Sequence, residues 1–141
     1  MDEEVEILIV EDNATDLEMT LRALKRQNVG NRILALRDGA EVLDYFFGNG
    51  HKRDNPLPRV ILLDLKLPKV DGIDVLRKLK AEERTRRIPV VVLTSSTEES
   101  DRLASYDLGA NSFVVKPVEF DAFSRAIADL GLYWLVVNRQ P

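Results

Sequence analysis

The sequence predicts a doubly wound α/β domain, in which helices cover both faces of a five-stranded parallel sheet. Five short apolar runs recur along the 141 residues. These runs are rich in Val, Ile and Leu and do not alternate cleanly with polar residues, which is typical of strands buried on both faces. Segments with apolar residues at helical spacing separate the runs, so strand and helix alternate along the chain. Right-handed crossovers then place helices on both faces of the sheet.

The predicted strands are the five apolar runs, which in chain order are Val5–Val10, Ile33–Leu36, Val60–Leu63, Val90–Leu93 and Phe113–Val115. Before the third strand lies the longest irregular stretch, from Gly48 to Pro58. Gly, Asn and Pro crowd this stretch, which therefore predicts an exposed loop.

The predicted helices are marked by apolar residues that share one face. Leu17, Leu21 and Leu24 recur at i, i+4 and i+7 and mark the first helix. The later helices are indicated, in chain order, by Val42 and Phe46, by Ile73, Leu76 and Leu79, less strongly by Ala104 and Leu108, and by Phe120, Phe123, Ile127, Leu130 and Trp134.

Composition excludes several classes of protein. The chain has no cysteine, which excludes disulfides and thiolate metal sites. It opens on acidic residues and has no apolar run near the roughly 20 residues of a membrane span, so we expect a cytoplasmic protein with no membrane partner. The net charge of −4 argues against nucleic acid as a partner. The length fits a single domain over residues 1–141.

Chemically active side chains follow four of the five predicted strands. In sheets of this kind, ligands bind at the carboxyl ends of the strands, which all meet at one edge. The residues delivered to that edge are Glu11-Asp12-Asn13 after the first strand, Asp64 after the third, Thr94-Ser95-Ser96 after the fourth and Lys116-Pro117 after the fifth.

Three carboxylates at one edge predict a divalent cation. Like charges in a cleft repel each other and lose hydration, and a hard cation neutralises them, with Lys116 adding a further positive charge. Mg²⁺ prefers oxygen ligands and keeps several waters, so two or three protein oxygens suffice. We expect Asp12 and Asp64 to be direct ligands and Glu11 to act directly or through water. The backbone carbonyl of Lys66 could fill another position.

Each of these residues also has an ordinary structural interpretation. Glu11, Asp12 and Asn13 could simply start the first helix, because acids and Asn are favoured there. Thr94 could be a strand-end hydroxyl with a local hydrogen bond, and Lys116 a solvated strand end. Their combination at one edge favours the functional interpretation.

Three strings and two dipeptides of the chain resemble response-regulator receiver domains of two-component systems. The strings are Leu8-Ile9-Val10-Glu11-Asp12-Asn13, Leu62-Leu63-Asp64-Leu65-Lys66-Leu67-Pro68 and Val115-Lys116-Pro117, and the dipeptides are Asp71-Gly72 and Gly109-Ala110. The resemblance covers nearly the whole chain. It implies a flavodoxin-like fold with five helices and strand order 2-1-3-4-5.

The resemblance implies a role for each residue at the predicted edge. Asp64 is the phosphoacceptor, which takes a phosphoryl group from a histidine kinase, and Glu11 and Asp12 form the metal pocket. Thr94 is the switch hydroxyl and Lys116 contacts the phosphoryl group.

The resemblance also implies a conformational switch. Phe113 matches the switch aromatic and swings inward as Thr94 moves onto the phosphoryl group. The surface of the fourth helix, fifth strand and fifth helix then changes shape for a partner or for dimerisation. The Lys116–Pro117 peptide bond is usually cis in this family. We also expect Ser96 and Lys66 to set the lifetime of the phosphate.

Two features that minimal receiver domains lack make the resemblance more specific. The loop from Gly48 to Pro58 is long, and the chain ends in an apolar segment, Leu132–Val137, without an attached output domain. Both features resemble stand-alone regulators that work with phytochrome-type histidine kinases. The apolar end could fold back over the core or form a dimer or partner surface. His51 lies in the long loop and is expected to be solvated.

Three other functions compete with a signalling phosphoacceptor that catalyses only its own phosphorylation and dephosphorylation. A haloacid-dehalogenase-type phosphatase usually has a second acid two residues after its nucleophile, where this chain has Lys66. A nucleotide-binding domain needs a Gly-rich first turn, where this chain has acids. An unphosphorylated scaffold leaves the acid, Thr and Lys set unexplained.

Overall fold

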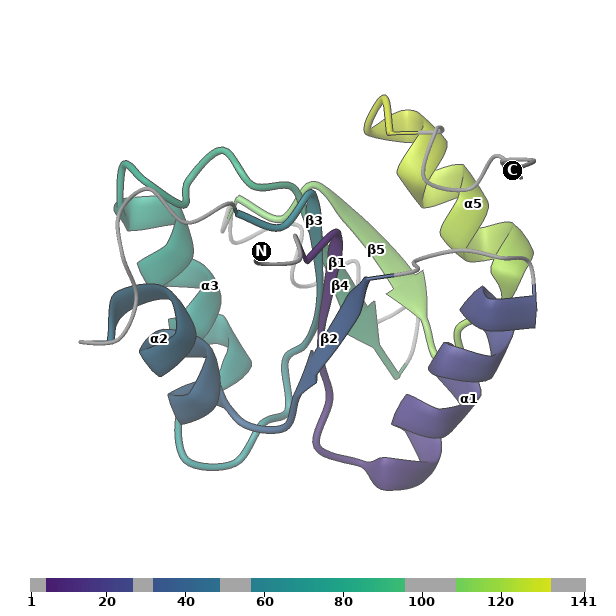
Figure 1. Ribbon diagram of the computed structural model, residues 1–141, viewed down its shortest axis with the longest axis horizontal. Helices are drawn as coiled ribbons and strands as arrows, with labels where there is room; N and C mark the ends of the chain where they lie inside the picture. Colours follow the sequence, from purple (N-terminus) through teal and green to yellow (C-terminus); the bar gives the residue numbers. More distant parts are fainter. Residues whose placement is uncertain (1–4, 27–31, 49–56, 96–108, 133–141) are drawn as a thin grey trace.

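A computed structural model describes residues 5–26, 32–48, 57–95 and 109–132. Its centre is a parallel sheet with strand order β2-β1-β3-β4-β5, as predicted (Figure 1). The strands are β1 (Ile7–Val10), β2 (Ile33–Leu36), β3 (Val60–Asp64), β4 (Val90–Thr94) and β5 (Ser112–Val115).

The strand ends differ from the prediction by one or two residues. Strand β1 begins at Ile7 rather than Val5, because the ladders to β2 and β3 both start at Ile7. Strands β3 and β4 each take in one more residue, since Asp64 pairs with Leu93 and Thr94 pairs with Val115. Backbone pairing is indifferent to side-chain polarity, so a polar residue can end a strand that hydropathy places one residue shorter.

Four helices are described, and they cover the two faces of the sheet in pairs (Figure 1). Helices α1 (Ala14–Arg26) and α5 (Phe120–Asp129) lie on one face. Helices α2 (Gly39–Phe47) and α3 (Gly72–Ala81) lie on the other. The predicted fourth helix falls within 96–108, outside the described residues. No helix of the described part combines the length and apolar character needed to cross a bilayer.

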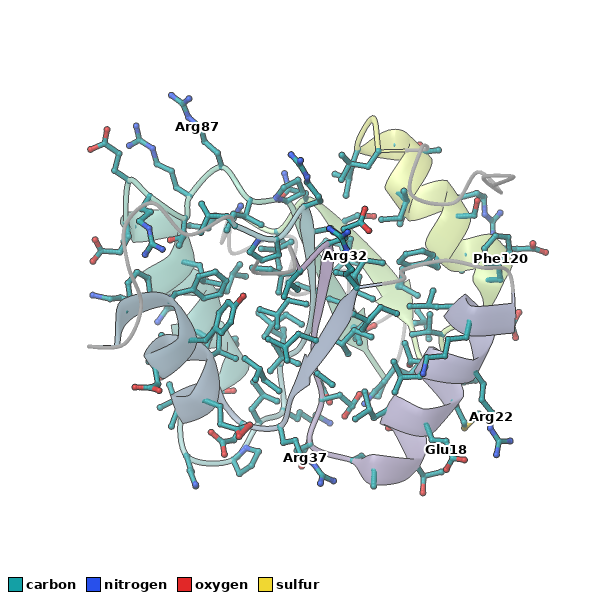
Figure 2. The ribbon with its side chains drawn as sticks, viewed as in Figure 1. Glu18, Arg22, Arg32, Arg37, Arg87 and Phe120 are labelled. Carbon is teal, nitrogen blue, oxygen red and sulfur yellow. The ribbon has the colours of Figure 1, made fainter. Side chains whose placement is uncertain are left out.

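Two apolar layers hold the helices against the sheet, and charged side chains such as Arg22 and Arg87 point outward (Figure 2). Because side chains alternate between the faces of a strand, neighbours in β1 belong to different layers. Ile7 and Ile9 pack with α1 and α5, whereas Leu8 and Val10 pack with α2 and α3. The predicted helix faces lie in these layers, as shown by the buried Leu24, Val42, Phe46, Leu76, Leu79, Phe123 and Ile127.

The loop between β3 and α3 is held against the start of α2. Asp38 caps α2 by accepting a hydrogen bond from the Glu41 amide through Oδ1 at 2.8 Å. Its Oδ2 lies 3.4 Å from the Lys69 ammonium, and Gly39 N–H donates to the Pro68 carbonyl at 3.4 Å. A Cβ on Gly39 would overlap the backbone oxygen of Val70, so glycine permits this close approach. The loop that follows the carboxyl end of β3 is therefore anchored.

Candidate functional site

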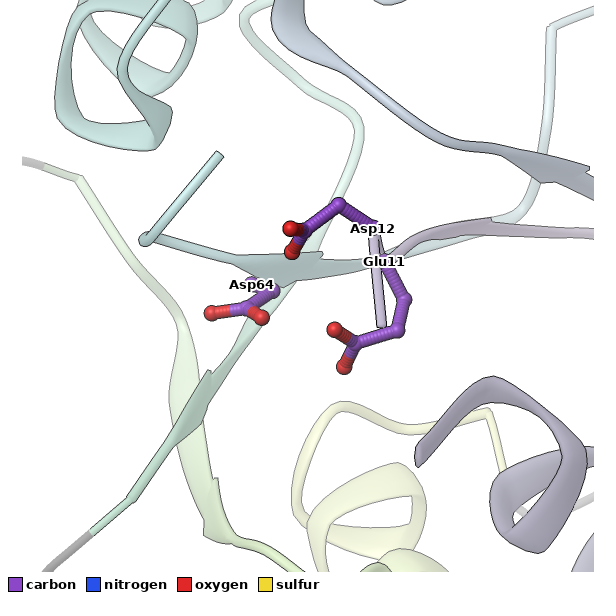
Figure 3. Close-up of side chains that lie close together, drawn as sticks. All are labelled: Glu11, Asp12 and Asp64. Atoms are coloured by element: carbon purple, nitrogen blue, oxygen red, sulfur yellow. The ribbon is translucent and has the colours of Figure 1, made fainter. Parts of the chain in front are cut away.

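Three carboxylates converge at the carboxyl ends of β1 and β3 (Figure 3). Glu11 directly follows β1, and its amide extends the ladder by donating to the Leu36 carbonyl at 3.0 Å. Asp64 is the last residue of β3. Glu11 and Asp64 are 1% and 4% exposed, whereas Asp12 is open to solvent. One oxygen from each of Glu11, Asp12 and Asp64 lies within 4.8 Å of the others.

The backbone around Asp64 fixes the direction of its carboxylate. Its Oδ1 accepts a 3.0 Å hydrogen bond from the amide of Lys66. Gly72 N–H closes the following loop onto the Leu65 carbonyl at 2.9 Å, and there is no space for a Cβ on Gly72 against Leu65. The exposed Lys66 thus contributes through its backbone, although the described contact is from its amide and not from the carbonyl predicted as a metal ligand.

Lys116 brings a positive charge to the same edge. It directly follows β5, and its amide donates to the Thr94 carbonyl at 2.7 Å. Its ammonium Nζ lies 3.0 Å from Asp64 Oδ2, 3.0 Å from Asp16 Oδ2 and 3.3 Å from Glu11 Oε1. The Lys116 side chain is only 17% exposed. The lysine therefore lies inside the carboxylate cluster, as predicted from its position after the last strand.

Burial and charge change the protonation of this cluster. Burial raises the pKa of Glu11 to about 7, and hydrogen bonding with Asp64 and the charge of Asp64 act in the same direction. Burial alone would lower the pKa of Lys116, but hydrogen bonds to Asp64 and Asp16 and the charges of Asp64 and Glu11 together raise it. The lysine stays charged, and Glu11 takes up a proton more readily than an ordinary glutamate does.

Asp16 is a contact of Lys116 that the sequence did not identify. It lies in the first turn of α1, where Asn13 caps the helix by accepting the Asp16 amide on Oδ1 at 2.9 Å. The amide of Asn13 donates in turn to Glu11 Oε2 at 3.2 Å. Helix dipoles favour an acid at any position in a first turn, so only the fold could distinguish Asp16 from an ordinary surface acid.

The remaining predicted residues surround the cluster. Thr94 is buried at the end of β4, and Phe113 is half-buried in β5, packed against the layer that contains Val92. The Lys116–Pro117 peptide bond is cis, as the resemblance implies. Ser96, His51 and the apolar C-terminal segment from Tyr133 onward lie outside the described residues.

The donor set fits a hard divalent cation. Three carboxylate oxygens from three residues face one another, with no soft ligand among them. Mg²⁺ and Mn²⁺ favour carboxylate oxygen, and Mg²⁺ completes its octahedron with water. Each carboxylate oxygen of Glu11 and Asp64 accepts one described hydrogen bond, from a backbone amide or from Lys116, so lone pairs remain for an ion.

The fold and this site are those of a signalling receiver domain. The family model of the response regulator receiver domain matches residues 7–128. The chain therefore belongs to the response regulator receiver family and is a component of two-component signalling. The haloacid-dehalogenase-type phosphatase is not favoured.

The similarity to two relatives extends over nearly the whole chain. The chain is 46% identical over 136 residues to the probable methanogenesis regulatory protein FilR2 of Methanothrix harundinacea, covering 96% of this chain and 86% of that protein. It is 36% identical over 129 residues to the response regulator Rcp1 of Synechocystis, covering 92% and 88%.

Solved structures share the fold. The bacteriophytochrome response regulator RtBRR is 52% identical with a TM-score of 0.87, covering 99% of this chain and 85% of that one. The Mn²⁺-bound form of Rcp1 is 36% identical with a TM-score of 0.72, covering 97% and 99%. The phosphorylated cyanobacterial phytochrome response regulator RcpA is 34% identical with a TM-score of 0.73, covering 99% of each chain. Phytochrome-associated regulators are thus among its relatives.

Proposed function

We propose that this receiver accepts a phosphoryl group on Asp64 from a phosphohistidine of a sensor histidine kinase. One observation carries the proposal. An Asp64 carboxylate oxygen lies within 4.8 Å of oxygens of Glu11 and Asp12, and Asp64 Oδ2 lies 3.0 Å from the Lys116 ammonium. The proposed nucleophile thus lies beside both a carboxylate cluster that fits a cation and a positively charged side chain. The metal-bound and phosphorylated states named for Rcp1 and RcpA support both parts of the proposal.

The transfer exchanges one phosphorus bond for another. A carboxylate oxygen of Asp64 attacks the phosphorus, the P–N bond of the phosphohistidine breaks, and the bonding pair leaves with the imidazole. Such transfer depends on positioning and on stabilising the charge of the phosphoryl oxygens. The Lys116 ammonium contacts these oxygens in place of its present contact with Asp64 Oδ2.

Glu11, Asp12 and Asp64 would hold Mg²⁺, with the Lys66 carbonyl as a further proposed ligand. A bound Mg²⁺ would supply positive charge in addition to that of Lys116 and so offset the negative charge of the transferring oxygens. Glu11 has the raised pKa, so its carboxyl contributes fully as a ligand once it has lost its proton.

The response to phosphorylation passes through the neighbouring strands. We propose that the Thr94 hydroxyl turns onto a phosphoryl oxygen and that Phe113 follows, which shifts an equilibrium between two surface shapes. Both residues lie on paired strands, since β4 and β5 are joined in register. The outer surface near β5 and α5 then serves partner binding or dimerisation.

The kinase partner is proposed to be of phytochrome type, because RtBRR, Rcp1 and RcpA are the kinds of protein that this chain resembles. We further propose that residues 1–141 form a single receiver domain, which works in the cytoplasm without nucleic acid. A homodimer through the C-terminal segment stays a prediction, which light scattering of the phosphorylated and unphosphorylated chain can test.

The test of the proposed function is labelling by a small phosphodonor. With Mg²⁺ and acetyl phosphate, intact mass should show one added phosphoryl group on the wild-type chain and none on Asp64→Asn. Asp74→Asn is the matched control, because Asp74 is an exposed acid of α3 whose described partner is Arg77. Undiminished labelling of Asp64→Asn would refute Asp64 as the acceptor.

A further inference from the structure

We propose that Asp16 is a positioning residue that holds the Lys116 ammonium where the phosphoryl group arrives. The inference rests on the proposed function of Asp64 and adds a residue of α1 to its machinery. The observation is direct: Lys116 Nζ lies equally far, 3.0 Å, from Asp16 Oδ2 on α1 and from Asp64 Oδ2 on β3. The lysine bridges the helix and the sheet.

The start of α1 fixes Asp16 for this contact. Leu17 N–H donates to the Asn13 carbonyl at 2.9 Å, the first full helical bond, so Asn13 is the N-cap and Asp16 is the third helical residue. An acid at this position commonly bonds back to the amide of the N-cap residue. Here that amide donates to Glu11 at 3.2 Å instead. The Asp16 carboxylate is consequently available to Lys116.

These contacts form a closed ring. Glu11 accepts from the Asn13 amide, and Asn13 accepts from the Asp16 amide. Asp16 then accepts from the Lys116 ammonium, which also donates to Glu11 Oε1 at 3.3 Å. The ring ties the position of the ammonium to the backbone at the start of α1. A change at Asp16 therefore reaches Lys116 without an intervening flexible segment.

Asp16 differs from the other carboxylates that Lys116 contacts. Glu11 and Asp64 belong to the oxygen cluster that fits a metal ion, and Asp16 does not. When a divalent cation neutralises Glu11 and Asp64, their attraction for the ammonium weakens. The contact with Asp64 is also given up when that residue is phosphorylated. Asp16 is the described partner whose charge is unaffected by either event, so it keeps Lys116 in the cleft.

A purely structural role for Asp16 would stabilise α1 and leave the position of Lys116 unchanged. An acid in a first turn stabilises a helix through the macrodipole, whatever it contacts. Glu18 lies two residues further along α1, and its carboxylate pairs with Arg22 on the outer surface at 2.7 Å (Figure 2). Glu18→Gln removes the same charge from the same helix without touching Lys116. It is the matched control for Asp16→Asn.

The experiment compares labelling rates and the state of Lys116. At saturating Mg²⁺ and acetyl phosphate, Asp16→Asn should label roughly tenfold more slowly than wild type, because a misplaced charged group loses transition-state contact. Glu18→Gln should stay within about twofold, the scale of an exposed pair. In the Lys116→Ala background, Asp16→Asn should cause no further slowing. Additive slowing in that background, or a wild-type rate for Asp16→Asn, would overturn the inference.

A second readout separates this inference from the proposed function. The side-chain ¹H–¹⁵N NMR signal of Lys116 should shift or broaden in Asp16→Asn and stay in place in Glu18→Gln. A wild-type chain that takes no label would refute the proposed function, and the NMR signal would still decide the position of Lys116. A signal that is the same in wild type and Asp16→Asn would overturn the positioning role.

Discussion

The backbone N–H of Lys116 donates a 2.7 Å hydrogen bond to the carbonyl oxygen of Thr94. Lys116 follows β5 and Thr94 ends β4, so the two residues are joined through the main chain as well as lying at the same edge of the sheet. The preceding pair, Thr94 with Val115, closes the β4–β5 ladder. Movement of the Thr94 backbone is thus transmitted directly to the residue that carries the ammonium.

Replacing the Thr94 hydroxyl should separate labelling from response. Thr94→Val keeps the branched shape of a side chain that is 1% exposed and replaces its hydroxyl with a methyl group. We expect Asp64 still to be labelled, whereas the NMR shift of Phe113 on adding beryllofluoride should largely disappear. Thr20→Val is the control, because Thr20 is equally buried in α1. A full Phe113 response in Thr94→Val would refute the switch role of the hydroxyl.

Removing the ammonium should make folding depend on Mg²⁺. Lys116→Met leaves Glu11 and Asp64 buried without their cation, so the free energy of unfolding should fall by roughly 2–4 kcal/mol at pH 8 without metal. Saturating Mg²⁺ should recover most of this loss by binding the folded state. Urea denaturation with and without Mg²⁺ measures both effects.

Lys78→Met is the control for that substitution. Lys78 pairs with Glu82 at 2.8 Å, with about half of each side chain exposed, and its loss should cost less than about 1 kcal/mol. Equal losses for Lys78→Met and Lys116→Met would contradict the special position of Lys116.

Acid should selectively weaken the cap of α2. The hydrogen bond from the Glu41 amide lowers the pKa of Asp38 below its ordinary value of 3.8, and the charge of Lys69 adds to this. Because the folded pKa is lowered, the stabilisation is present above about pH 3.8 and is lost as the pH falls through the folded pKa. Asp38→Asn keeps a cap acceptor but has no charge to titrate.

Urea denaturation of both chains between pH 7 and pH 3 tests this linkage. The advantage of wild type over Asp38→Asn should be constant in the upper part of this range and shrink at its acid end. A difference that is the same at every pH would show that the Asp38 charge is not linked to folding.

Two glycine substitutions should destabilise for different reasons. A methyl group on Gly39 would overlap the Val70 carbonyl, so Gly39→Ala should cost roughly 1–3 kcal/mol and displace the β3–α3 loop. Gly131 has a φ of +76° and open space around it, so Gly131→Ala should cost only the ~1 kcal/mol of left-handed backbone. Calorimetric titration should show weaker Mg²⁺ binding for Gly39→Ala and unchanged binding for Gly131→Ala. Equal Mg²⁺ affinity in both would contradict the anchoring of the loop.

Apolar periodicity predicted the sheet and the helix faces because it reports burial directly. Strands covered on both faces must be apolar throughout, and the run Val60–Leu63 satisfied this requirement. Parallel strands end at the same edge of a sheet, and the sequence therefore predicted that Glu11, Asp64 and Lys116 lie close together. Hydropathy could not locate the strand ends, since Asp64 and Thr94 continue the backbone ladder as polar residues.

The contacts between α1 and the site could not be predicted from the sequence. Asp16 resembles any acid that favours a helix start, and its partner lies 100 residues away along the chain. Its role depends on the rotation of α1 about its axis, which the cap at Asn13 fixes. The same cap resolves the two interpretations of Glu11-Asp12-Asn13, because Asn13 starts the helix while Glu11 and Asp12 precede it.

The alternation of side chains along the strands makes the sheet a partition between two compartments. Asp64 follows Leu63 and projects with Leu62 toward the α1 and α5 compartment, where Lys116 meets Asp16. Thr94 and Phe113 project to the opposite compartment, which α2 and α3 fill. The Asp64 carboxylate and the side chains of Thr94 and Phe113 thus lie on opposite faces of the sheet. Contact between the proposed phosphoryl group on Asp64 and the Thr94 hydroxyl must therefore form at the edge where β3 and β4 end, and not through the packed interior.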